Sequence, residues 1–353
     1  MISAAVRLFV LLFSLSVQPT FADSTTVKFK HMVVLGDSLS DQGNLFFATS
    51  DLGQAFLLPP IPAADHYYMG RFSNGENYAG LLAQKLGITL APSESGGSNY
   101  AFGGARTDYN RVEFRPNVPP PLPNGVYPIA AYPWSLDLQR EAFLDDATRH
   151  ADPKGLYVVF TGSNDLSDAL TALLFLHQDP TPTIAKAVQG IKNVITAFET
   201  VGAQTVLVLS VPNLGVVPSV TRFGPTVSGI ATALSQQFNA ALAAMLTTVT
   251  GTNIILFDTY SFLNGVVAHP GDYGLSNVTQ PCYSGYVDPN PNATVCAEPD
   301  NYAFWDIEHP TTRFHSILAD ELYASVLHCE GEKKDDTNSA SGRSMSRCAV
   351  NAH

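Results

Sequence analysis

The chain has few charged residues, and the basic ones are the scarcer kind. Charged side chains make up 14% of its 353 residues, with 19 lysines and arginines against 31 aspartates and glutamates, which gives a formal net charge of −12. No run of lysine or arginine occurs in the body of the chain. Because proteins that bind nucleic acid gather basic side chains against the phosphates, this composition argues against a nucleic-acid partner.

Apolar runs of membrane-spanning length are also missing. Residues 8–17 form a short apolar stretch behind Arg7, and Thr20-Phe21-Ala22 follows it. That stretch is shorter than the roughly 20 residues of a membrane span, and the pattern is typical of an export signal with a small-x-small cleavage site. The alternative is a membrane anchor or a buried helix. We expect residues 1–22 to be a signal peptide, and the mature chain, from Asp23, to be secreted or periplasmic without a transmembrane segment.

Cysteine occurs only four times, always in the last quarter of the sequence, at Cys282, Cys296, Cys329 and Cys348. An even number of cysteines in an exported chain indicates disulfides, and three pairings are possible. Pairing between nearest neighbours is the simplest, and closing the first loop would stabilise the fold by roughly 3 kcal/mol. Metal ligation is the alternative, but no C-x-x-C or H-x-x-x-H spacing accompanies these cysteines. We therefore expect disulfides and no metal site.

Two larger patterns are absent as well. The sequence contains no G-x-S-x-G, which excludes the nucleophile elbow of the α/β-hydrolases. It contains no internal repeat and no linker that would mark a second domain. We therefore expect one domain over residues 23–330 and a polar, loosely ordered tail over residues 331–353, tied back by Cys348. Seven prolines from Pro116 to Pro133 predict a surface loop.

What is present is an alternation of short apolar runs with longer helical patterns. Strands are predicted at Met32–Leu35, Leu156–Phe160, Thr205–Leu209 and Asn253–Phe257. Helices are predicted at Asn77–Leu86, Leu136–Leu144, Thr183–Val201, Thr226–Val249 and Thr312–Leu327. Strands that are apolar throughout are typical of a parallel sheet buried on both faces, so we predict an α/β fold. Functional groups in such folds lie beyond the carboxyl ends of the strands, where Ser38, Asn164 and Asn213 fall.

Ser38 is the candidate nucleophile. It lies in Gly36-Asp37-Ser38-Leu39-Ser40, directly after the first apolar run, and Gly36 permits a tight turn there. The turn would project the hydroxyl out of the sheet, and a following helix would offer backbone N–H groups to an anion. A serine hydroxyl is a weak nucleophile that needs a base, and the base needs a third group to orient it. The alternative is a serine that caps a helix.

Asp306-Ile307-Glu308-His309-Pro310, near the end of the chain, supplies a base together with its partner. A spacing of three residues lets the Asp306 carboxylate bind one ring nitrogen of His309 while the other faces the serine. The carboxylate would fix the tautomer and stabilise the imidazolium that forms. The alternative is a cap for the helix that starts at Thr312.

Two further segments offer hydrogen-bond donors for an oxyanion. Asn164, in Gly162-Ser163-Asn164-Asp165, carries an amide that can donate to developing negative charge, and one such donor is worth about 3 kcal/mol in a transition state. Gly103-Gly104 can present a backbone N–H without a blocking Cβ. An ordinary turn is the alternative for both segments.

Taken in chain order, the segments with Ser38, Gly104, Asn164 and Asp306-x-x-His309 resemble the blocks of the GDSL, or SGNH, hydrolases, from about residue 30 to about residue 328. The resemblance implies a three-layer α/β/α, flavodoxin-like fold with a mainly parallel central sheet. It also implies that Ser38 is the nucleophile, His309 the base and Asp306 the residue that orients the base. The implied oxyanion hole consists of the backbone N–H groups of Ser38 and Gly104 with the Asn164 side chain, or of Gly103 in place of Gly104. No metal or organic cofactor is implied.

Within that family, further segments resemble bacterial secreted lipases, a branch that includes lysophospholipases, phospholipases A and glycerophospholipid–cholesterol acyltransferases. These segments are Gly70-Arg71-Phe72-Ser73-Asn74-Gly75, Val211-Pro212-Asn213-Leu214-Gly215, Tyr273-Gly274-Leu275-Ser276-Asn277 and Phe304-Trp305-Asp306. Some acyltransferases of the branch carry a much longer disulfide-bounded region than the stretch between Cys282 and Cys296. This difference argues against acyl transfer.

We therefore expect a secreted serine esterase that hydrolyses the acyl esters of lysophospholipids or phospholipids, with a lipid ester substrate that lies at a membrane surface. The alternatives are a glycerophospholipid–cholesterol acyltransferase, a carbohydrate or short-chain acyl esterase on the same fold, and a non-catalytic binding module. Apolar residues close behind the nucleophile are candidates for an acyl site, with core packing as the alternative: Phe46, Phe47, Phe56, Leu57 and Leu58. The oligomeric state is left open.

Overall fold

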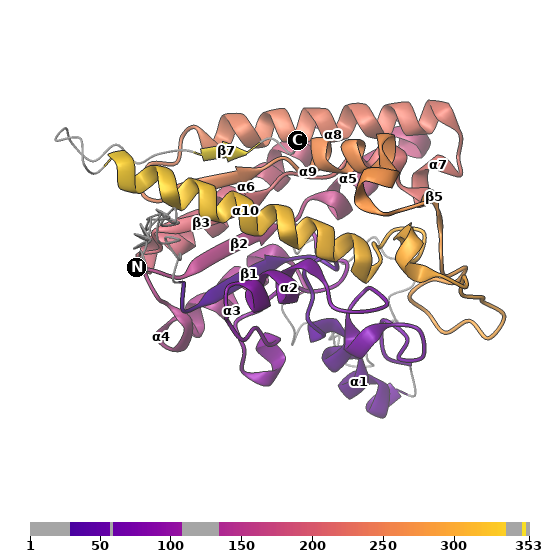
Figure 1. Ribbon diagram of the computed structural model, residues 1–353, viewed down its shortest axis with the longest axis horizontal. Helices are drawn as coiled ribbons and strands as arrows, with labels where there is room; N and C mark the ends of the chain where they lie inside the picture. The colour runs from indigo at the N-terminus through magenta and orange to yellow at the C-terminus, as the bar shows by residue number, and fades with distance from the viewer. Residues whose placement is uncertain (1–28, 57–58, 108–133, 337–347, 351–353) are drawn as a thin grey trace, which may run out of the picture.

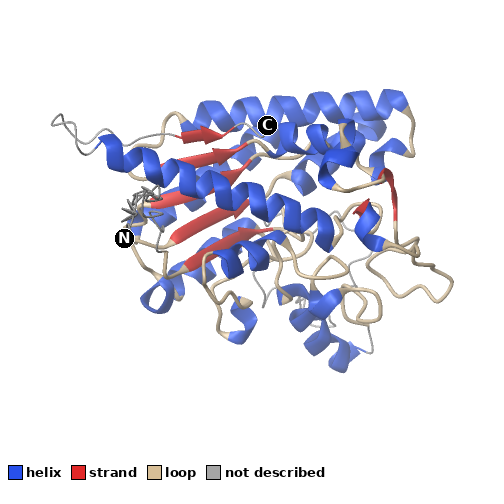
Figure 2. Cartoon of the chain, in the orientation of Figure 1, coloured by secondary structure: helices blue, strands red, loops and turns tan. Residues whose placement is uncertain are grey.

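The computed structural model describes residues 29–56, 59–107, 134–336 and 348–350 (Figure 1). The expected signal peptide and the proline-rich segment 116–133 lie outside these residues. At the centre of the described part is a parallel sheet in the order β1-β2-β3-β4-β7. Its strands are β1 (Met32–Gly36), β2 (Leu156–Phe160), β3 (Thr205–Leu209), β4 (Asn253–Phe257) and β7 (Cys348–Val350). Figure 2 shows these strands side by side, with helices in front of them and behind them.

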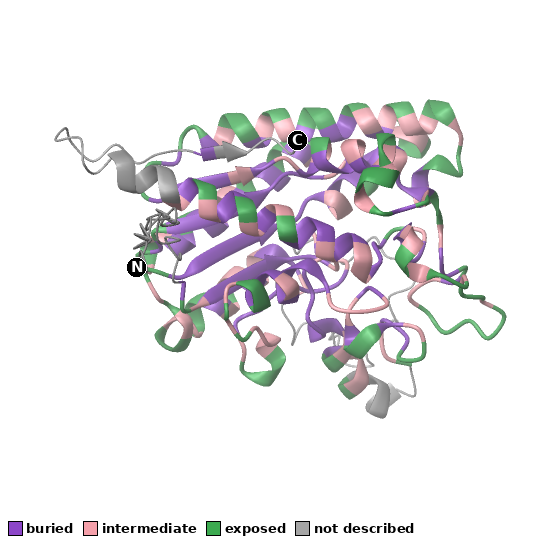
Figure 3. Ribbon diagram, viewed as in Figure 1, coloured by how far each residue is buried: buried purple, intermediate pink, exposed green. Residues whose placement is uncertain are grey.

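The first three strands are buried along their whole length, as their unbroken apolar sequences predict. Figure 3 shows this burial concentrated in the sheet, with exposed residues on the outer faces of the helices. Each buried valine, leucine or isoleucine side chain contributes about 1.5–3 kcal/mol when it leaves water. The sheet is therefore the rigid centre of the domain, and its edges position the site.

Helices cover both faces of the sheet. They are α1 (Asn44–Phe56), α2 (Tyr78–Lys85), α3 (Leu136–Asp145), α4 (Ala147–His150), α5 (Ser163–Leu176), α6 (Thr181–Thr200), α7 (Pro218–Thr221), α8 (Pro225–Leu246), α9 (Thr259–Ala268) and α10 (Thr312–Asp336). Helices α2 and α10 pack on each other over one face, and α6 lies between α3 and α8 on the other (Figure 1). This is the predicted three-layer α/β/α architecture. None of the helices within the described residues has the length and apolar character that a membrane crossing requires.

An extended segment, residues 98–102, runs along the outer edge of β1. Val34 donates its backbone N–H to the carbonyl of Ser98, and Tyr100 donates to the carbonyl of Val34. Val34 and Asn99 form a parallel bridge. Counted with this segment, the spatial order is second, first, third, fourth, fifth and sixth along the chain, and its first five positions follow the flavodoxin-like order. The carboxyl ends of three neighbouring segments therefore lead to Gly104, Ser38 and Asn164 at one edge.

The later part of the chain adds a smaller sheet and two disulfides. Strands β5 (Asn277–Pro281) and β6 (Tyr302–Phe304) pair in parallel. Cys282 and Cys296 are joined with an S–S distance of 2.07 Å, and Cys329 and Cys348 with 1.99 Å. Of the three pairings open from the sequence, the structure has the nearest-neighbour one.

The predicted strands agree with the structure, and the five predicted helices agree to within a few residues except at the end of α10. That helix continues to Asp336, and Cys348–Val350 pairs with β4 as a strand of the central sheet. The expectation of a loosely ordered tail is therefore wrong for these residues. The physical reason is the disulfide from Cys329, which lies on α10 and holds Cys348 against the sheet edge. Helices α1, α5 and α9 and the short helices α4 and α7 have no counterpart in the prediction.

Candidate active site

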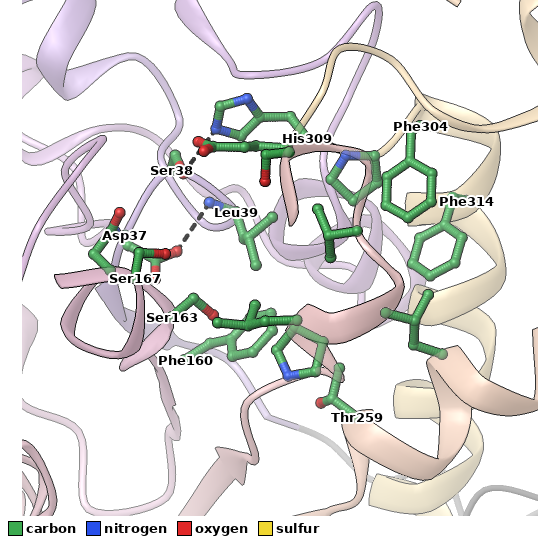
Figure 4. A pocket seen from close by; sticks show the side chains of 18 of the residues that line it. Asp37, Ser38, Leu39, Phe160, Ser163, Ser167, Thr259, Phe304, His309 and Phe314 are labelled. Carbon is green, nitrogen blue, oxygen red and sulfur yellow. Dashed lines mark hydrogen bonds between the residues drawn. The ribbon is translucent and has the colours of Figure 1, made fainter. Parts of the chain in front are cut away.

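The structure brings Ser38, His309 and Asp306 together beyond the carboxyl end of the sheet. The Nε2 atom of His309 lies 3.0 Å from the Ser38 hydroxyl oxygen (Figure 4), and its Nδ1 atom lies 2.8 Å from Asp306 Oδ2. Ser38 and His309 are 271 residues apart in the sequence, so only the fold joins them. A hydroxyl bound to an imidazole that is itself bound to a carboxylate can lose its proton to the ring.

Asp306 is fully buried and accepts several hydrogen bonds. Its Oδ1 atom accepts the backbone N–H groups of Glu308 and His309 at 2.7 and 2.8 Å. Its Oδ2 atom accepts the Tyr67 hydroxyl at 2.5 Å in addition to His309 Nδ1. The carboxylate thus orders its own loop and the histidine ring. It does not cap α10, since Thr311 Oγ1 accepts the N–H of Phe314 there.

The protonation states of this pair follow from burial and charge. Burial by itself would raise the pKa of Asp306, but the adjacent His309 and the hydrogen bonds hold that pKa below its ordinary value. Burial would lower the pKa of His309, but Asp306 and then Glu308 and Asp37 bring it above the ordinary 6.5. Asp306 is therefore ionised, and it favours an imidazolium at His309.

Ser38 lies in a turn rather than at a helix end. The backbone N–H groups of Ser40 and Asp41 both donate to the carbonyl of Asp37, while α1 begins only at Asn44. Ser38 is therefore not a helix cap, and the expected helix does not follow it directly. Among the described residues, no hydrogen-bond acceptor takes the Ser38 backbone N–H, so this donor faces the space beside the hydroxyl.

Two buried groups next to Ser38 shape this turn. Gly36 has no room for a side chain, because a Cβ there would lie 2.4 Å from the backbone oxygen of Phe160 on β2. The side-chain Oδ1 atom of Asp37 accepts the backbone N–H of Leu39 at 3.1 Å. Burial raises the pKa of Asp37 to about 7. The serine therefore follows a strand end that tolerates only glycine and a carboxyl group that titrates near neutral pH.

The two adjacent glycines of the oxyanion segment have different roles. Gly103 already donates its N–H to Asp41 Oδ2 at 2.8 Å, and a Cβ on it would lie 2.2 Å from the Phe72 ring. Gly104 has a φ of 72°, in the left-handed region that glycine favours. Since the Gly103 donor is in use, Gly103 is a weak candidate for the oxyanion.

Arg106 holds the Gly104 loop in place. Its Nη1 group donates to the carbonyl of Gly104 at 2.7 Å, while its Nε and Nη2 groups bind the two carboxylate oxygens of Asp168 at 2.7 and 2.8 Å. The bidentate pair fixes the guanidinium on α5. Arg106 therefore joins the Gly104 loop to the helix that carries Asn164.

Asn164 lies in the first turn of α5, directly beyond β2. Its Nδ2 atom donates to the carbonyl of Ala105 at 3.0 Å. A side-chain amide has two N–H donors, so one bond orients the group and the other is left for an anion. The helix can start this close to the strand because Gly162 has a φ of 113° and no Cβ, which would lie 2.5 Å from Phe238.

A largely apolar cavity opens beside Ser38 and His309 (Figure 4). Its apolar lining includes Leu39, Leu214, Val217, Leu263, Phe304, Phe314 and Leu318. These residues come from the turn after β1, the segment after β3, helix α9 and the region from β6 to α10. The cavity is therefore assembled from segments that are far apart in the sequence.

Two of the expected acyl-site residues, Phe46 and Phe47, are not among the described residues that line this cavity. Phe46 and Phe47 lie on α1, which packs on the 3₁₀ turn η1 (Tyr68–Gly70), and Phe47 is 46% exposed. The side chains of Phe56, Leu57 and Leu58 lie outside the described residues. For Phe46 and Phe47 the prediction is wrong, because closeness to Ser38 in sequence does not place α1 on the cavity wall.

The Cys282–Cys296 disulfide closes a segment that contacts the base. Cys282 and Tyr283 donate their backbone N–H groups to the carbonyls of Phe304 and Trp305, just before Asp306. The Tyr286 ring stacks on His309, with ring centroids 6.0 Å apart, and its hydroxyl binds Glu308. The disulfide segment therefore packs directly against the loop that carries Asp306 and His309.

Several functional neighbours could not be found from the sequence. Tyr67, Arg106 and Tyr286 belong to no motif. Tyr67 and Tyr286 reach the site through contacts to Asp306 and His309, and Arg106 is fixed there by its ion pair with the distant Asp168. Asn213, at the end of β3, instead organises a turn through Gly215 and Thr232. Within the described part of the chain, no group of three histidine, cysteine, aspartate or glutamate residues lies close enough together to hold a metal ion.

Comparisons with known proteins cover most of the chain. The family model of GDSL-like lipases and acylhydrolases matches residues 32–322. The chain is 24% identical to the GDSL esterase/lipase At2g23540 of Arabidopsis thaliana, over 82% of each protein, and 26% identical to At1g74460 of the same plant, over 83% of this chain and 85% of the relative. It is 29% identical to the esterase EstA of Pseudomonas aeruginosa, over 89% of this chain and 49% of EstA. The chain therefore belongs to the GDSL-like lipase/acylhydrolase family, which makes it a serine ester hydrolase.

Proposed function

We propose that this hydrolase cleaves the acyl esters of lipids, with lysophospholipids or phospholipids as substrates, through Ser38, His309 and Asp306. The observation that carries the proposal is the apolar cavity directly beside the Ser38 hydroxyl. A fatty acyl chain gains about 0.8 kcal/mol for each CH₂ group that it buries. A lipid ester would therefore be held with its carbonyl carbon near Ser38 and its chain among Leu214, Val217 and Phe314.

In the first step, the Ser38 oxygen attacks the ester carbonyl carbon while His309 Nε2 takes the hydroxyl proton. The 3.0 Å contact between Nε2 and Oγ supports this transfer without rearrangement. Asp306, bound to Nδ1, keeps the proton of the neutral ring on Nδ1 and stabilises the imidazolium that forms. The carbonyl oxygen becomes the oxyanion of a tetrahedral intermediate.

The oxyanion would be bound by the backbone N–H groups of Ser38 and Gly104 and by the second N–H of the Asn164 amide. These three donors follow β1, the edge segment 98–102 and β2, which are neighbours in the sheet. Donors that are fixed before the reaction starts lower the barrier because they need not reorient as charge develops. Arg106 keeps the Gly104 loop in position through its carbonyl.

The intermediate collapses when His309 returns its proton to the leaving alcohol oxygen, which breaks the carbon–oxygen bond and leaves the acyl group on Ser38. A water molecule then attacks the acyl carbonyl while His309 takes one of its protons. His309 returns that proton to the Ser38 oxygen, and the fatty acid is released. Every proton moves through Nε2, and no redox partner is needed.

A second candidate is an esterase for short acyl groups on carbohydrates. Three residues that line the same cavity, Asp37, Ser163 and Thr259, carry buried side-chain oxygen atoms that have no partner among the described residues. Unpaired buried polar atoms favour a ligand, or water, that can hydrogen-bond. This feature favours a polar substrate, whereas the apolar lining favours a fatty acyl chain.

Export from the cytoplasm is part of the proposal. Both cysteine pairs are at disulfide distance, and such bonds persist in oxidising compartments. Together with the export signal expected at residues 1–22, the disulfides support a secreted or periplasmic enzyme.

The substrate is tested by product analysis. The oxidised enzyme is given a series of p-nitrophenyl esters from acetyl to palmitoyl, then lysophosphatidylcholine and phosphatidylcholine, with and without cholesterol. We expect the long esters to be preferred and fatty acid to be released from the phospholipids. Preference for acetyl esters with no fatty acid released would instead support the carbohydrate esterase, and formation of cholesteryl ester would identify an acyltransferase.

A further inference from the structure

Tyr67 makes a contact to the base that no motif accounts for. Its hydroxyl donates to Asp306 Oδ2 at 2.5 Å, and the same oxygen accepts His309 Nδ1 at 2.8 Å. Asp306 Oδ1 is occupied by two backbone N–H groups. The hydroxyl and the imidazole therefore compete for the charge on a single carboxylate oxygen.

The Tyr67 ring is held firmly in this position. It is 3% exposed and lies between the rings of Tyr283 and Phe72, with centroid distances of 5.9 and 6.4 Å and interplanar angles of 87° and 63°. Tyr283 in turn stacks on Trp305 at 5.5 Å and follows Cys282 of the disulfide. Tyr67 is not among the residues that line the cavity, so it contacts the carboxylate and not the substrate.

The Tyr67 hydroxyl stays protonated wherever the enzyme is folded. Burial first, and then the negative charge of Asp306, raise the pKa of Tyr67 far above its ordinary value. A neutral hydroxyl that donates to a buried carboxylate replaces part of the hydration that the anion has lost. It also takes up part of the negative charge that would otherwise stabilise a protonated His309.

We propose that Tyr67 is a positioning residue for the base: it fixes Asp306 Oδ2 against His309 and limits how strongly the carboxylate holds a proton on the ring. This inference rests on the proposed roles of His309 and Asp306. Without the hydroxyl, the carboxylate would bind the imidazolium more tightly, and the base would be occupied by a proton up to a higher pH.

Other charged and titratable groups also face this pair. Around His309 they are Asp37, Glu308 and His315, and around Asp306 they are Tyr283 and Tyr286. His315 is buried and has its pKa lowered to about 3, so it stays neutral. Tyr67→Phe removes one oxygen atom and leaves all these groups in place. A change in the pH profile of this variant is therefore due to the loss of the hydroxyl.

The test is the pH dependence of kcat/KM for Tyr67→Phe on a soluble p-nitrophenyl ester. We expect the acidic limb to move to higher pH by about half a unit. We also expect kcat on the plateau to fall about tenfold with KM unchanged. An unmoved limb together with an unchanged kcat would overturn the proposal, and so would a loss confined to KM.

Tyr283→Phe is the matched control, since Tyr283 lies in the same aromatic cluster and its hydroxyl has no partner among the described residues. The Tyr283→Phe variant should keep the acidic limb of the wild-type pH profile. An equal shift of that limb in both variants would assign the effect to packing. Titration of the His309 ring by NMR in a Ser38→Ala background gives the same comparison without relying on activity. A histidine titration unaltered by Tyr67→Phe would contradict the proposal.

A double-mutant cycle separates this inference from the proposed function. In an Asp306→Asn background, where the carboxylate charge is gone, adding Tyr67→Phe should change nothing further. If Asp306→Asn itself keeps wild-type kcat, the proposed triad fails. If Asp306→Asn is impaired while Tyr67→Phe behaves as wild type, only the role of Tyr67 fails.

Discussion

The two sides of the active site are held in place in different ways. Ser38, Gly104 and Asn164 follow neighbouring extended segments of the central sheet, whose register is set by backbone hydrogen bonds. Asp306 and His309 lie in a loop outside that sheet, between β6 and α10. That loop is held by a carboxylate, a tyrosine hydroxyl and the packing of a disulfide segment.

The difference has a mechanical consequence. A sheet register rests on many bonds that form together, so it is kept or lost as a whole. The loop with Asp306 and His309 also has backbone hydrogen bonds, such as that from Trp305 N–H to the His309 carbonyl. Its contacts from Tyr67 and Tyr286 are each made by one side chain, and one such contact can be lost while the fold is kept. Single substitutions on the base side should therefore change rate and pH dependence with little loss of stability, whereas those in the buried scaffold of the nucleophile should mainly affect stability.

The largest effect is expected within one pentapeptide. Ser38→Ala should lower kcat by at least about 10⁴-fold, because the nucleophile is lost. Ser40→Ala should keep activity but reduce stability by about 1–3 kcal/mol, since Ser40 Oγ and the Tyr78 hydroxyl form a buried hydrogen bond of 2.7 Å. Labelling with a fluorophosphonate and thermal melting distinguish the two outcomes. Persistent labelling of Ser38→Ala would show that another serine is the nucleophile.

The pH dependence tests the base side. His309 acts as a base only when neutral, and its pKa is raised above 6.5 by Asp306 against the effect of burial. Below that pKa, kcat/KM should fall about tenfold per pH unit. The pH dependence of stability runs in the opposite direction to that of activity. The contribution of the charged His309–Asp306 pair to stability is complete below the unfolded histidine pKa of 6.5, and it is lost as the pH rises through the pKa of His309 in the folded protein. A kcat/KM that stays flat down to pH 5 would rule out His309 as the base.

The two disulfides offer a comparison within one chain. They close loops of similar length, with sequence separations of 14 and 19, so each should stabilise the fold by roughly 3 kcal/mol. Replacing Cys282 and Cys296 by serine should also lower kcat about tenfold, because their segment packs on the base loop. Replacing Cys329 and Cys348 should lower only the melting temperature. Equal losses of kcat, measured well below both melting points, would mean that the first disulfide has no special link to the base.

The smallest effect concerns the cavity. Val217→Phe adds bulk to its wall and should lower kcat/KM for palmitoyl esters by about tenfold relative to acetyl esters. The acetyl ester serves as the internal control, since its short chain does not reach that wall. If both esters are affected alike, the acyl chain does not occupy this cavity.

Much of the scaffold could be predicted because the signals are local. Unbroken apolar runs identified β1 to β4, and the spacing of Asp306 and His309 brings a carboxylate to a ring within one loop. Helix α5 was missed because its start, Ser163–Asn164, has the composition of a turn. The edge segment 98–102 and the three-residue β7 were missed because each depends on pairing with a distant strand rather than on its own pattern.

The residues that neighbour the site show most clearly what the sequence could not predict. Tyr67 and Arg106 carry no spacing signal, and their contacts exist only because the fold places Asp306 beside Tyr67 and Asp168 beside Arg106. The cavity wall could not be predicted either, since Leu39, Leu263 and Phe314 come from separate elements. The choice between Gly103 and Gly104 also required the structure, which shows that Asp41 occupies the Gly103 donor.

By itself, the sequence determined the chemical groups and the α/β class. Apolar periodicity is set by burial, and the motifs place the required side chains at strand ends. Only the tertiary structure shows which groups surround Ser38 and His309, which residues line the cavity beside them, and that His309 and Tyr67 both bind Asp306 Oδ2. These properties depend on distances of about 3 Å between residues far apart in sequence, and such distances arise only when the whole core packs.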